Sequence, residues 1–239
     1  MSTKTRLIGG SGHILQVDLR EFSGRAFFST DLHGCYDLLH EKLNEVAFNS
    51  STDLLFLGAD MCDRGPDSQH VLDYLNEPWV YCIRANHEQL LIQTVEEGFS
   101  GPAARCLYEN GGEWFFNMLD QGQMSTIKAI YESFKSLPLA IELLTPTEKI
   151  GIVHAQVPSG CWDEFKKMTK PELEWNGEAT AQWARTNYDK KLSIQVGGVD
   201  RVMVGHTPTD SGEIEVLGNV WHCDLGSFFR DKISFVQLV

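Results

Sequence analysis

The hydrophobic pattern of the first hundred residues predicts strands that alternate with helices. The segment 53–57 (DLLFL) is a continuous apolar run, as in a strand that is buried on both faces. Over 36–46, leucine and valine recur at helical spacing. This alternation of strands and helices favours a largely parallel sheet. The predicted strands are 25–30, 53–57 and 79–83, and the predicted helices are 36–46, 68–75 and 88–95.

The middle of the chain is predicted to be helical, and the last third returns to strands. The segment 125–137 carries an apolar stripe, and we interpret Trp114 and the two phenylalanines after it as core residues. Because no repeat or linker is present, we predict a single domain over 1–239 with a helical insert at about 98–138. The further helices are 103–109, 114–118, 125–137 and one near 178–188, within an irregular segment 156–196. The further strands are 139–144, 149–154, 199–204, 213–216, 220–223 and 233–238.

The charge balance narrows the classes of partner. The 239 residues include 33 acidic and 20 basic side chains, which give a formal net charge of −13 at pH 7. The electrostatic field of this net negative charge repels nucleic acid and anionic membrane surfaces, so we expect neither as a partner. The chain lacks a run of about 18 apolar residues and an apolar signal-peptide core, which predicts a cytoplasmic protein. The six cysteines lack metal-site spacing and are predicted to be reduced, packed thiols; the oligomeric state is left open.

Five short segments place hard metal ligands directly after predicted strands. In an extended chain, residues i and i+2 point to the same side, so Asp31 and His33 can hold one ion. Carboxylate, imidazole and amide groups without thiolate suit Mn²⁺, Fe or Zn²⁺ in a mixed site. Two divalent ions beside Asp31 and Asp60 would keep a positive surplus for a hydroxide and an anionic substrate, as in two-metal hydrolases. The segments are DLHG (31–34), DMCDRG (60–65), NHE (86–88), HA (154–155) and GH (205–206).

Together these segments resemble one enzyme superfamily. D-x-H-G, D-x-x-D-R-G and N-H-E, in this order, fix ten positions, which chance does not match. From about residue 26 to about 230 the sequence resembles the metallophosphoesterase superfamily. Within it, the similarity is to serine/threonine phosphatases of the phosphoprotein-phosphatase class, of the bacterial and bacteriophage-lambda type. Further matching segments are DLHGCYDLL (31–39), DRGPDS (63–68), RANHEQLLI (84–92), NGGEWFF (110–116), LPLAIEL (137–143), VHA (153–155), WAR (183–185) and VGHTP (204–208).

The resemblance implies both a fold and an activity. The implied fold is an αββα sandwich of two mixed sheets flanked by helices. The implied activity is that of a protein serine/threonine phosphatase acting on phosphorylated proteins or peptides, with phosphotyrosine left open as a substrate. The implied reaction is in-line attack by a hydroxide that bridges two divalent metal ions, without a phosphoenzyme. We expect the ions to be Mn²⁺, with Fe or Zn²⁺ as alternatives.

The resemblance also implies a role for each site residue. Asp60 bridges the two metals, His87 is the general acid oriented by Asp63, and Arg64 and Arg185 bind phosphate oxygens. These roles have physical reasons, because a histidine beside a carboxylate is protonated near pH 7 and a guanidinium binds phosphate bidentately. The implied ligands are Asp31, His33 and Asp60 for one metal, and Asp60, Asn86, His154 and His206 for the other.

Three residues depart from the family pattern. Thr30, Ala59 and Ala85 stand directly before metal ligands, at positions where the family has glycine. A side chain at these positions costs little conformational free energy if φ is negative, whereas a positive φ favours glycine. We hypothesise that Ala85→Gly tightens metal binding or raises turnover.

The other candidate residues receive structural interpretations. Cys62 is expected to pack in the core, and Glu88 to complement a helix dipole. Arg84 is left open between a substrate contact and an ion pair of the fold. The remaining histidines are expected to be at the surface or in satisfied structural positions; they are His13, His40, His70 and His222.

Two rival functions come from different classes. The first is a symmetrical dinucleoside-tetraphosphate hydrolase of the same superfamily. Asp63 before Arg64 and Glu88 after His87 favour the protein phosphatases, because the rival typically has Ala and Asp at these positions. The second rival is a non-catalytic phosphopeptide-binding scaffold, which the three lost glycines favour and the complete ligand set opposes.

Overall fold

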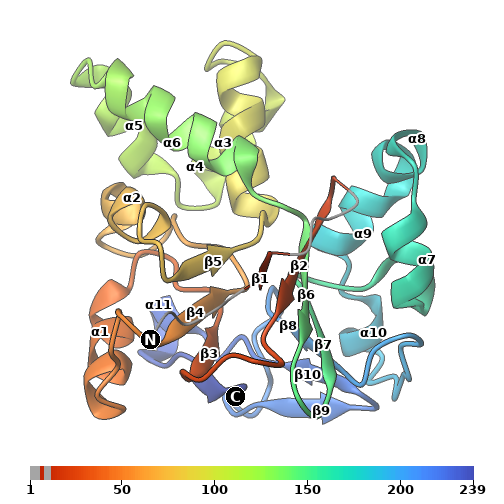
Figure 1. Cartoon of the computed structure of the whole chain (residues 1–239). Helices are drawn as coiled ribbons and strands as arrows, with labels where there is room; N and C mark the ends of the chain where they lie inside the picture. The colour runs from red at the N-terminus through yellow and green to blue at the C-terminus, as the bar shows by residue number, and fades with distance from the viewer. Residues whose placement is uncertain (1–5, 8–11) are drawn as a thin grey trace.

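Two β-sheets lie face to face between layers of helices in the computed structural model, which describes residues 6–7 and 12–239 (Figure 1). The expectation that the chain lacks a signal peptide rests mainly on residues outside these ranges. The predicted αββα sandwich of two mixed sheets flanked by helices is confirmed. No helix among the described residues is both long enough and apolar enough to cross a bilayer.

The smaller sheet carries the first part of the site. Its strands lie in the order β11-β3-β4-β5, with the last three parallel and β11 antiparallel at the edge. Every residue of β3 and β4 is buried, which explains their continuous apolar sequence. The strands are β3 (Ala26–Ser29), β4 (Leu54–Leu57), β5 (Val80–Cys82) and β11 (Val236–Gln237). The connecting helices are α1 (Tyr36–Glu45), a 3₁₀ turn (Ser68–His70) with α2 (Val71–Leu75), and α3 (Asn86–Glu96).

The larger sheet has seven strands among the described residues, in the order β1-β2-β6-β7-β8-β10-β9. Alternate side chains of β8 separate two cores: Met203 faces the smaller sheet, whereas Val202 and Val204 face the outer helices. The strands are β1 (Arg6–Leu7), β2 (Ile14–Asp18), β6 (Ala140–Leu144), β7 (Lys149–Val153), β8 (Arg201–Val204), β9 (Glu215–Leu217) and β10 (Val220–His222).

Short helices cover the outer face of the larger sheet, while α4, α5 and α6 project beyond the sheets (Figure 1). The covering layer packs through the buried side chains of Trp162 and Phe165. Its elements are a 3₁₀ turn (Pro158–Gly160), α7 (Trp162–Lys167), α8 (Lys170–Glu172), a π-helical turn (Leu173–Gly177), α9 (Glu178–Trp183) and α10 (Thr186–Asp189). The remaining helices are α4 (Pro102–Glu109), α5 (Glu113–Asp120), α6 (Met124–Ser136) and α11 (Ser227–Arg230).

The structure differs from the predicted elements in several places: the elements β1, α7, α8 and α11 were not predicted, and there are three further differences. Strand β2 was not predicted, although it lies inside the larger sheet and pairs in parallel with β6. The helix predicted near 178–188 is two helices, because Ala184 adopts an extended ψ of 131° and separates α9 from α10. The strand predicted over 233–238 is regular only at Val236–Gln237.

Candidate dinuclear metal site

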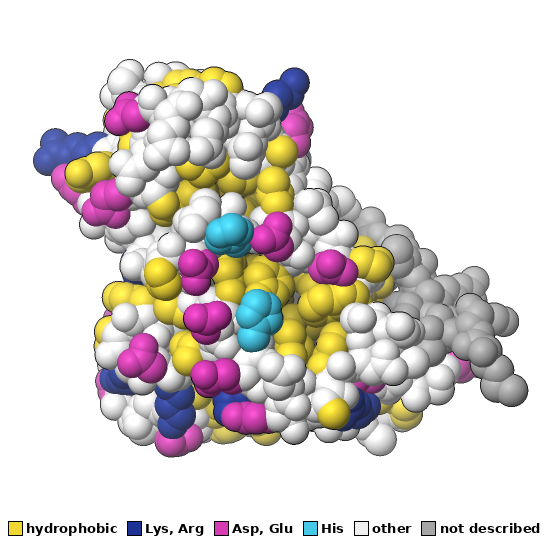
Figure 2. Space-filling view, turned by 90° about the vertical axis from the view of Figure 1, so that its left-hand side faces the viewer, with side chains coloured by type: hydrophobic (Ala, Val, Ile, Leu, Met, Phe, Trp, Pro, Cys, Tyr) yellow, Lys and Arg dark blue, Asp and Glu magenta, His cyan; other side chains and the backbone are white. Residues whose placement is uncertain are grey.

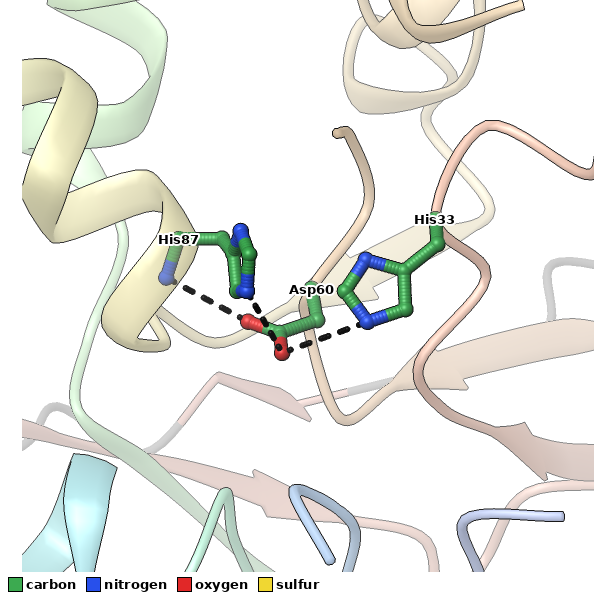
Figure 3. A group of neighbouring side chains, drawn as sticks. All are labelled: His33, Asp60 and His87. Atoms are coloured by element: carbon green, nitrogen blue, oxygen red, sulfur yellow. Dashed lines mark hydrogen bonds and ion pairs between the residues drawn. The ribbon is translucent and has the colours of Figure 1, made fainter. Parts of the chain in front are cut away.

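Two groups of buried metal-ligand side chains share Asp60. His33, Asp60 and His87 form the first group, and Asp60, His154 and His206 form the second; within each group the candidate ligand atoms lie within 4.8 Å of one another. His33 follows β3, Asp60 follows β4, and His87 lies in the first turn of α3. Figure 3 shows His33 and His87 on opposite sides of the Asp60 carboxylate. The parallel strands β3, β4 and β5 therefore place these side chains together at the carboxyl ends of the strands.

Three of the histidines are each anchored by a backbone carbonyl. A carbonyl only accepts hydrogen bonds, so the ring nitrogen that faces it must carry a proton, and the other nitrogen is the one that can bind a metal. Nε2 of His33 and Nε2 of His154 then face Asp60 Oδ2, at 3.6 and 3.3 Å. The anchoring bonds are His33 Nδ1 to Cys62 O (2.9 Å), His154 Nδ1 to Gly58 O (2.8 Å) and His206 Nε2 to Trp183 O (3.1 Å).

The protonation of His33 and His206 suits cation binding, whereas a cation at His154 has to displace a proton. Burial, with His154 and Arg185 nearby, lowers the pKa of His206 to about 3, and burial lowers the pKa of His33 to about 3. Both imidazoles are therefore neutral, so each ring has one unprotonated nitrogen. Burial alone would lower the pKa of His154, but Asp60 outweighs it and raises this pKa to about 10. Burial alone would raise the pKa of Asp60, but the surrounding histidines hold it well below its usual value.

Two buried polar atoms at the site lack hydrogen-bond partners among the described residues. They are Oδ1 of Asn86, at the start of α3, and Nε2 of His154. An unpaired buried polar atom is costly, so such atoms favour a bound partner. An amide oxygen and an imidazole nitrogen beside a carboxylate fit a divalent cation with mixed nitrogen and oxygen ligands.

Asp31 stands outside both groups. Its carboxylate accepts hydrogen bonds from the His206 backbone N–H (2.9 Å) and from the Thr30 hydroxyl (2.6 Å). Burial and the nearby Asp224 raise the pKa of Asp31 well above its usual value. Gly205 permits this approach, because a Cβ on it would lie 1.8 Å from Asp31 Oδ2. The structure thus places Asp31 against the His206 loop.

His87 and Asp63 form a buried pair beside Asp60. His87 Nδ1 lies 2.6 Å from Asp63 Oδ2, and His87 Nε2 lies 3.9 Å from Asp60 Oδ2. Burial alone would lower the pKa of His87, but the carboxylates of Asp60 and Asp63 outweigh it and raise this pKa. The imidazole can therefore carry a proton near neutral pH, with Nε2 directed toward the metal-ligand groups.

The two predicted phosphate-binding arginines lie at the exposed side of the site. Arg64 Nη1 is 2.7 Å from His33 Nε2, and its guanidinium stacks on Phe228 at 5.1 Å. This guanidinium must leave His33 Nε2 before that nitrogen can bind a metal ion. Arg185 is exposed in the break between α9 and α10, close enough to His206 to contribute to its lowered pKa.

Backbone strain is concentrated in the ligand loops. Asp31, His33, Ala59, Asp60 and His206 all have positive φ, although none is glycine. A left-handed residue with a Cβ costs roughly 1–2 kcal/mol. Of the three residues that replace family glycines, only Ala59 has this conformation, with φ +68°. Ala85 is extended, with φ −102° and ψ −173°, so its backbone gives no support to the hypothesis that Ala85→Gly tightens metal binding or raises turnover.

Ala59→Gly is therefore expected to be the better tolerated of two matched substitutions. Ala59 and Ala85 are both fully buried and both precede a candidate ligand, so each change removes one buried methyl group. Only Ala59→Gly also relieves left-handed strain, and we expect it to exceed Ala85→Gly by about 1–2 kcal/mol in the free energy of unfolding. Urea denaturation of the two variants measures this difference. Equal stabilities would show that Ala59 carries no strain.

Glu88 binds the Asp60 loop to the start of α3. Its buried carboxylate accepts the backbone N–H groups of Met61 (2.8 Å), Ala85 (3.0 Å) and Asp60 (3.3 Å). Burial and the neighbouring Asp60 raise the pKa of Glu88 to about 7. The sequence interpretation, that Glu88 complements the helix dipole, missed this contact between two ligand segments.

Glu88→Gln is expected to destabilise the protein by about 1–3 kcal/mol, because a side-chain amide has one acceptor oxygen and leaves buried N–H groups unpaired. Thermal unfolding monitored by circular dichroism checks this. Glu96→Gln, at the exposed end of the same helix, is the matched control; it loses only a surface ion pair with Lys135, worth at most about 1 kcal/mol. If both variants unfold alike, Glu88 does not connect the loops.

Most of the residues that were expected to have a structural role, and no role in the site, are buried or have a partner within the fold. All six cysteines are free thiols, and Cys62 is fully buried. His13 bonds the Phe165 carbonyl, whereas His222 is buried with Nδ1 unpaired among the described residues. Arg84, which lies after β5, is 3.6 Å from Glu178 at the start of α9 and forms an ion pair with it. Asp224, which follows β10, was not singled out, although it lies after a strand like the predicted ligands; burial and Asp60 raise its pKa to about 6.

A hollow with both polar and apolar lining residues lies on the face formed by α1 and α2. Figure 2 shows two histidines among several carboxylates on this face. The hollow holds about 510 Å³, but His70 pairs with Asp73, and His40 with Tyr74. Each of these histidines has its own side-chain partner at the surface, as the sequence predicted, and neither belongs to a metal-ligand group.

The combination of fold and site defines a class of protein. Two ligand groups that share one aspartate, at the ends of strands in a two-sheet α/β sandwich, form a candidate dinuclear metal centre of a hydrolase. The chain belongs to the calcineurin-like phosphoesterase family, whose model matches residues 24–210. It is therefore a metallophosphoesterase.

Named relatives agree with this family, and a solved structure shares the fold. The chain is 31% identical to serine/threonine-protein phosphatase 2 of Escherichia coli (strain K12), over 87% of this chain and 90% of that protein. It is 37% identical to the symmetrical bis(5'-nucleosyl)-tetraphosphatase of Buchnera aphidicola, but over only 28% of this chain and 25% of that protein. The crystal structure of a putative diadenosine tetraphosphatase has the same fold, with a TM-score of 0.60 at 19% identity over 93% of each chain.

Proposed function

We propose that this protein is a metal-dependent serine/threonine phosphatase that hydrolyses phosphate monoesters in phosphorylated proteins or peptides. The observation that carries the proposal is the pair of ligand groups around Asp60, with the His87–Asp63 hydrogen bond beside it. Similarity to a serine/threonine phosphatase over nearly the whole of both chains supports the substrate class.

The side chains that would hold two divalent ions lie on both sheets. We propose Mn²⁺, because the donors are imidazole nitrogens and carboxylate or amide oxygens, without thiolate. Bound ions would supply a nucleophilic water near neutral pH and neutralise charge on the phosphoryl group. The proposed ligands are Asp31, His33 and Asp60 for one ion, and Asp60, Asn86, His154 and His206 for the other.

The chain's own residues bind the phosphate and move the proton. Arg64 and Arg185 bear charged guanidinium groups on the exposed side, where they bind phosphate oxygens and orient the ester. His87 gives the proton on Nε2 to the departing oxygen of serine or threonine. Asp63 holds Nδ1 of that ring, so the proton to be donated is on the nitrogen that faces the site.

The rival activity is the hydrolysis of dinucleoside tetraphosphates. It is favoured by local similarity to the symmetrical tetraphosphatases, which spans 68 residues against 208 for the protein phosphatases. The longer match includes both sheets' ligand segments, whereas a match of 68 residues cannot span 31–206. We therefore prefer the protein phosphatase.

Three substrates distinguish the functions when purified protein is assayed with Mn²⁺. We expect turnover of p-nitrophenyl phosphate and of a phosphoserine peptide, with diadenosine tetraphosphate hydrolysed more slowly by at least a factor of about ten in kcat/KM. Preference for diadenosine tetraphosphate would make the protein a tetraphosphatase. Bound metal without turnover of any substrate would make it a non-catalytic binding protein.

A further inference from the structure

The carboxylate that orients His87 has a second buried partner. Asp63 is fully buried, and each of its oxygens accepts one short hydrogen bond: Oδ2 faces His87 Nδ1 at 2.6 Å, and Oδ1 accepts the indole N–H of Trp114 at 2.6 Å. A planar carboxylate that is held at both oxygens cannot rotate about its Cβ–Cγ bond. Trp114, which lies in the first turn of α5, thus fixes the direction in which Asp63 meets His87.

The loop before Trp114 holds the adjacent backbone. Asp63 and Arg64 both have φ +71°, a conformation that non-glycine residues keep only when the surrounding structure enforces it. The Arg64 N–H donates to Gly111 O at 3.0 Å. Gly111 itself has φ +95°, and a Cβ on it would lie 2.6 Å from Arg64 N, so the close approach requires glycine. The α4–α5 segment therefore contacts the Asp63–Arg64 turn through both backbone and side chain.

We propose that Trp114 is a positioning residue for proton donation: with the Gly111 loop, it holds Asp63 so that His87 meets the leaving oxygen. The inference rests on the proposed function, because it takes His87 as the proton donor. The projecting helices α4–α6 would then orient the proton donor, in addition to any role as a lid or as part of the core. The expectation that Trp114 is a core residue missed this contact, since its ring is only half-buried and its N–H is directed at Asp63.

The decisive measurement is how kcat depends on the basicity of the leaving group. Proton donation accelerates the reaction most when the departing oxygen is strongly basic. In Trp114→Phe, which removes the N–H and keeps an aromatic ring, we expect kcat on a phosphoserine peptide and on phenyl phosphate to fall about tenfold to a hundredfold. On p-nitrophenyl phosphate, whose leaving group needs no proton, we expect less than about a threefold loss, and KM should change little on any substrate.

A matched substitution separates positioning from simple loss of an indole. Trp79 is also half-buried and also donates its indole N–H to a carboxylate, that of Glu77 at 2.7 Å, away from the site. Trp79→Phe is expected to keep wild-type kcat on all three substrates. An equal loss on all substrates in Trp114→Phe, or no loss on any, would overturn the proposal while the wild-type turnover still supports the phosphatase function.

A second readout does not depend on turnover. Proton NMR of the metal-free protein should show a downfield imidazole N–H, assigned to His87 Nδ1 by its absence in His87→Asn. We expect this signal to persist in Trp79→Phe and to be lost by faster exchange with water in Trp114→Phe. An unchanged signal in Trp114→Phe contradicts the positioning role, even if the wild-type protein hydrolyses none of the substrates and the proposed function itself fails.

Discussion

Replacing Asp60 with asparagine is expected to release both metal ions and to lower turnover by about a thousandfold or more. Asp60 is the one residue common to both ligand groups, and His33, His87 and His154 all lie within 3.9 Å of its Oδ2. The substitution removes the negative charge that these groups share. Metal ions contribute several kcal/mol to transition-state stabilisation in such sites, which corresponds to a factor of about 10³.

Elemental analysis after dialysis, together with p-nitrophenyl phosphate kinetics, measures both effects of Asp60→Asn. Asp53→Asn is the control, because Asp53 is also a buried aspartate next to β4 but pairs with Arg25 instead. We expect the control to lose stability and to keep its metal. If Asp60→Asn retained two ions per chain, Asp60 could not be the bridging ligand.

His87→Asn is expected to lower turnover of a phosphoserine peptide by about 10² to 10⁴, the range of general acid catalysis, with the metal content unchanged. Geometry alone allows a second role, since His87 belongs to a metal-ligand group and its Nδ1 bonds a carboxylate, as metal-binding histidines often do. The substitution separates the two roles, because a lost acid affects the rate whereas a lost ligand affects the metal.

The control for His87→Asn is His13→Asn. His13 is a buried histidine with a backbone carbonyl partner, and it lies outside both ligand groups. We expect the control to keep both turnover and metal. Loss of one ion per chain in His87→Asn, beyond any loss in the control, would make His87 a ligand and remove it as the proton donor.

The parts of the fold that could be predicted from sequence are those with strong local patterns. The apolar run of β4 and the amphipathic α6 lie within a few residues of their predicted bounds. Strand β2 was missed because its polar Gln16 finds a partner, Glu142, that lies 126 residues away in the sequence. The break at Ala184 was missed for a similar reason, since the Trp183 carbonyl there meets His206 from another part of the chain.

The site shows the same division between local and long-range signals. Residues of the short motifs could be listed from sequence because each motif sits at the end of one strand. Apart from the His87–Asp63 pair, which the resemblance implied, the partners of those residues could not: Trp114 reaches Asp63 across 51 positions, and Glu88 reaches Met61 across 27. Their hydrogen bonds depend on how deeply each residue is buried when the helices dock, which no local pattern records.

The distribution of the two ligand groups over the sheets has a consequence for how the protein assembles. The first group comes entirely from residues 33–87, around the smaller sheet, so it is complete once that half has folded. The second group needs His154 and His206 from the larger sheet, and the His154–Gly58 bond forms only when the halves meet. An ion in the second group would therefore join the two halves of the chain and raise the free energy of unfolding with metal concentration.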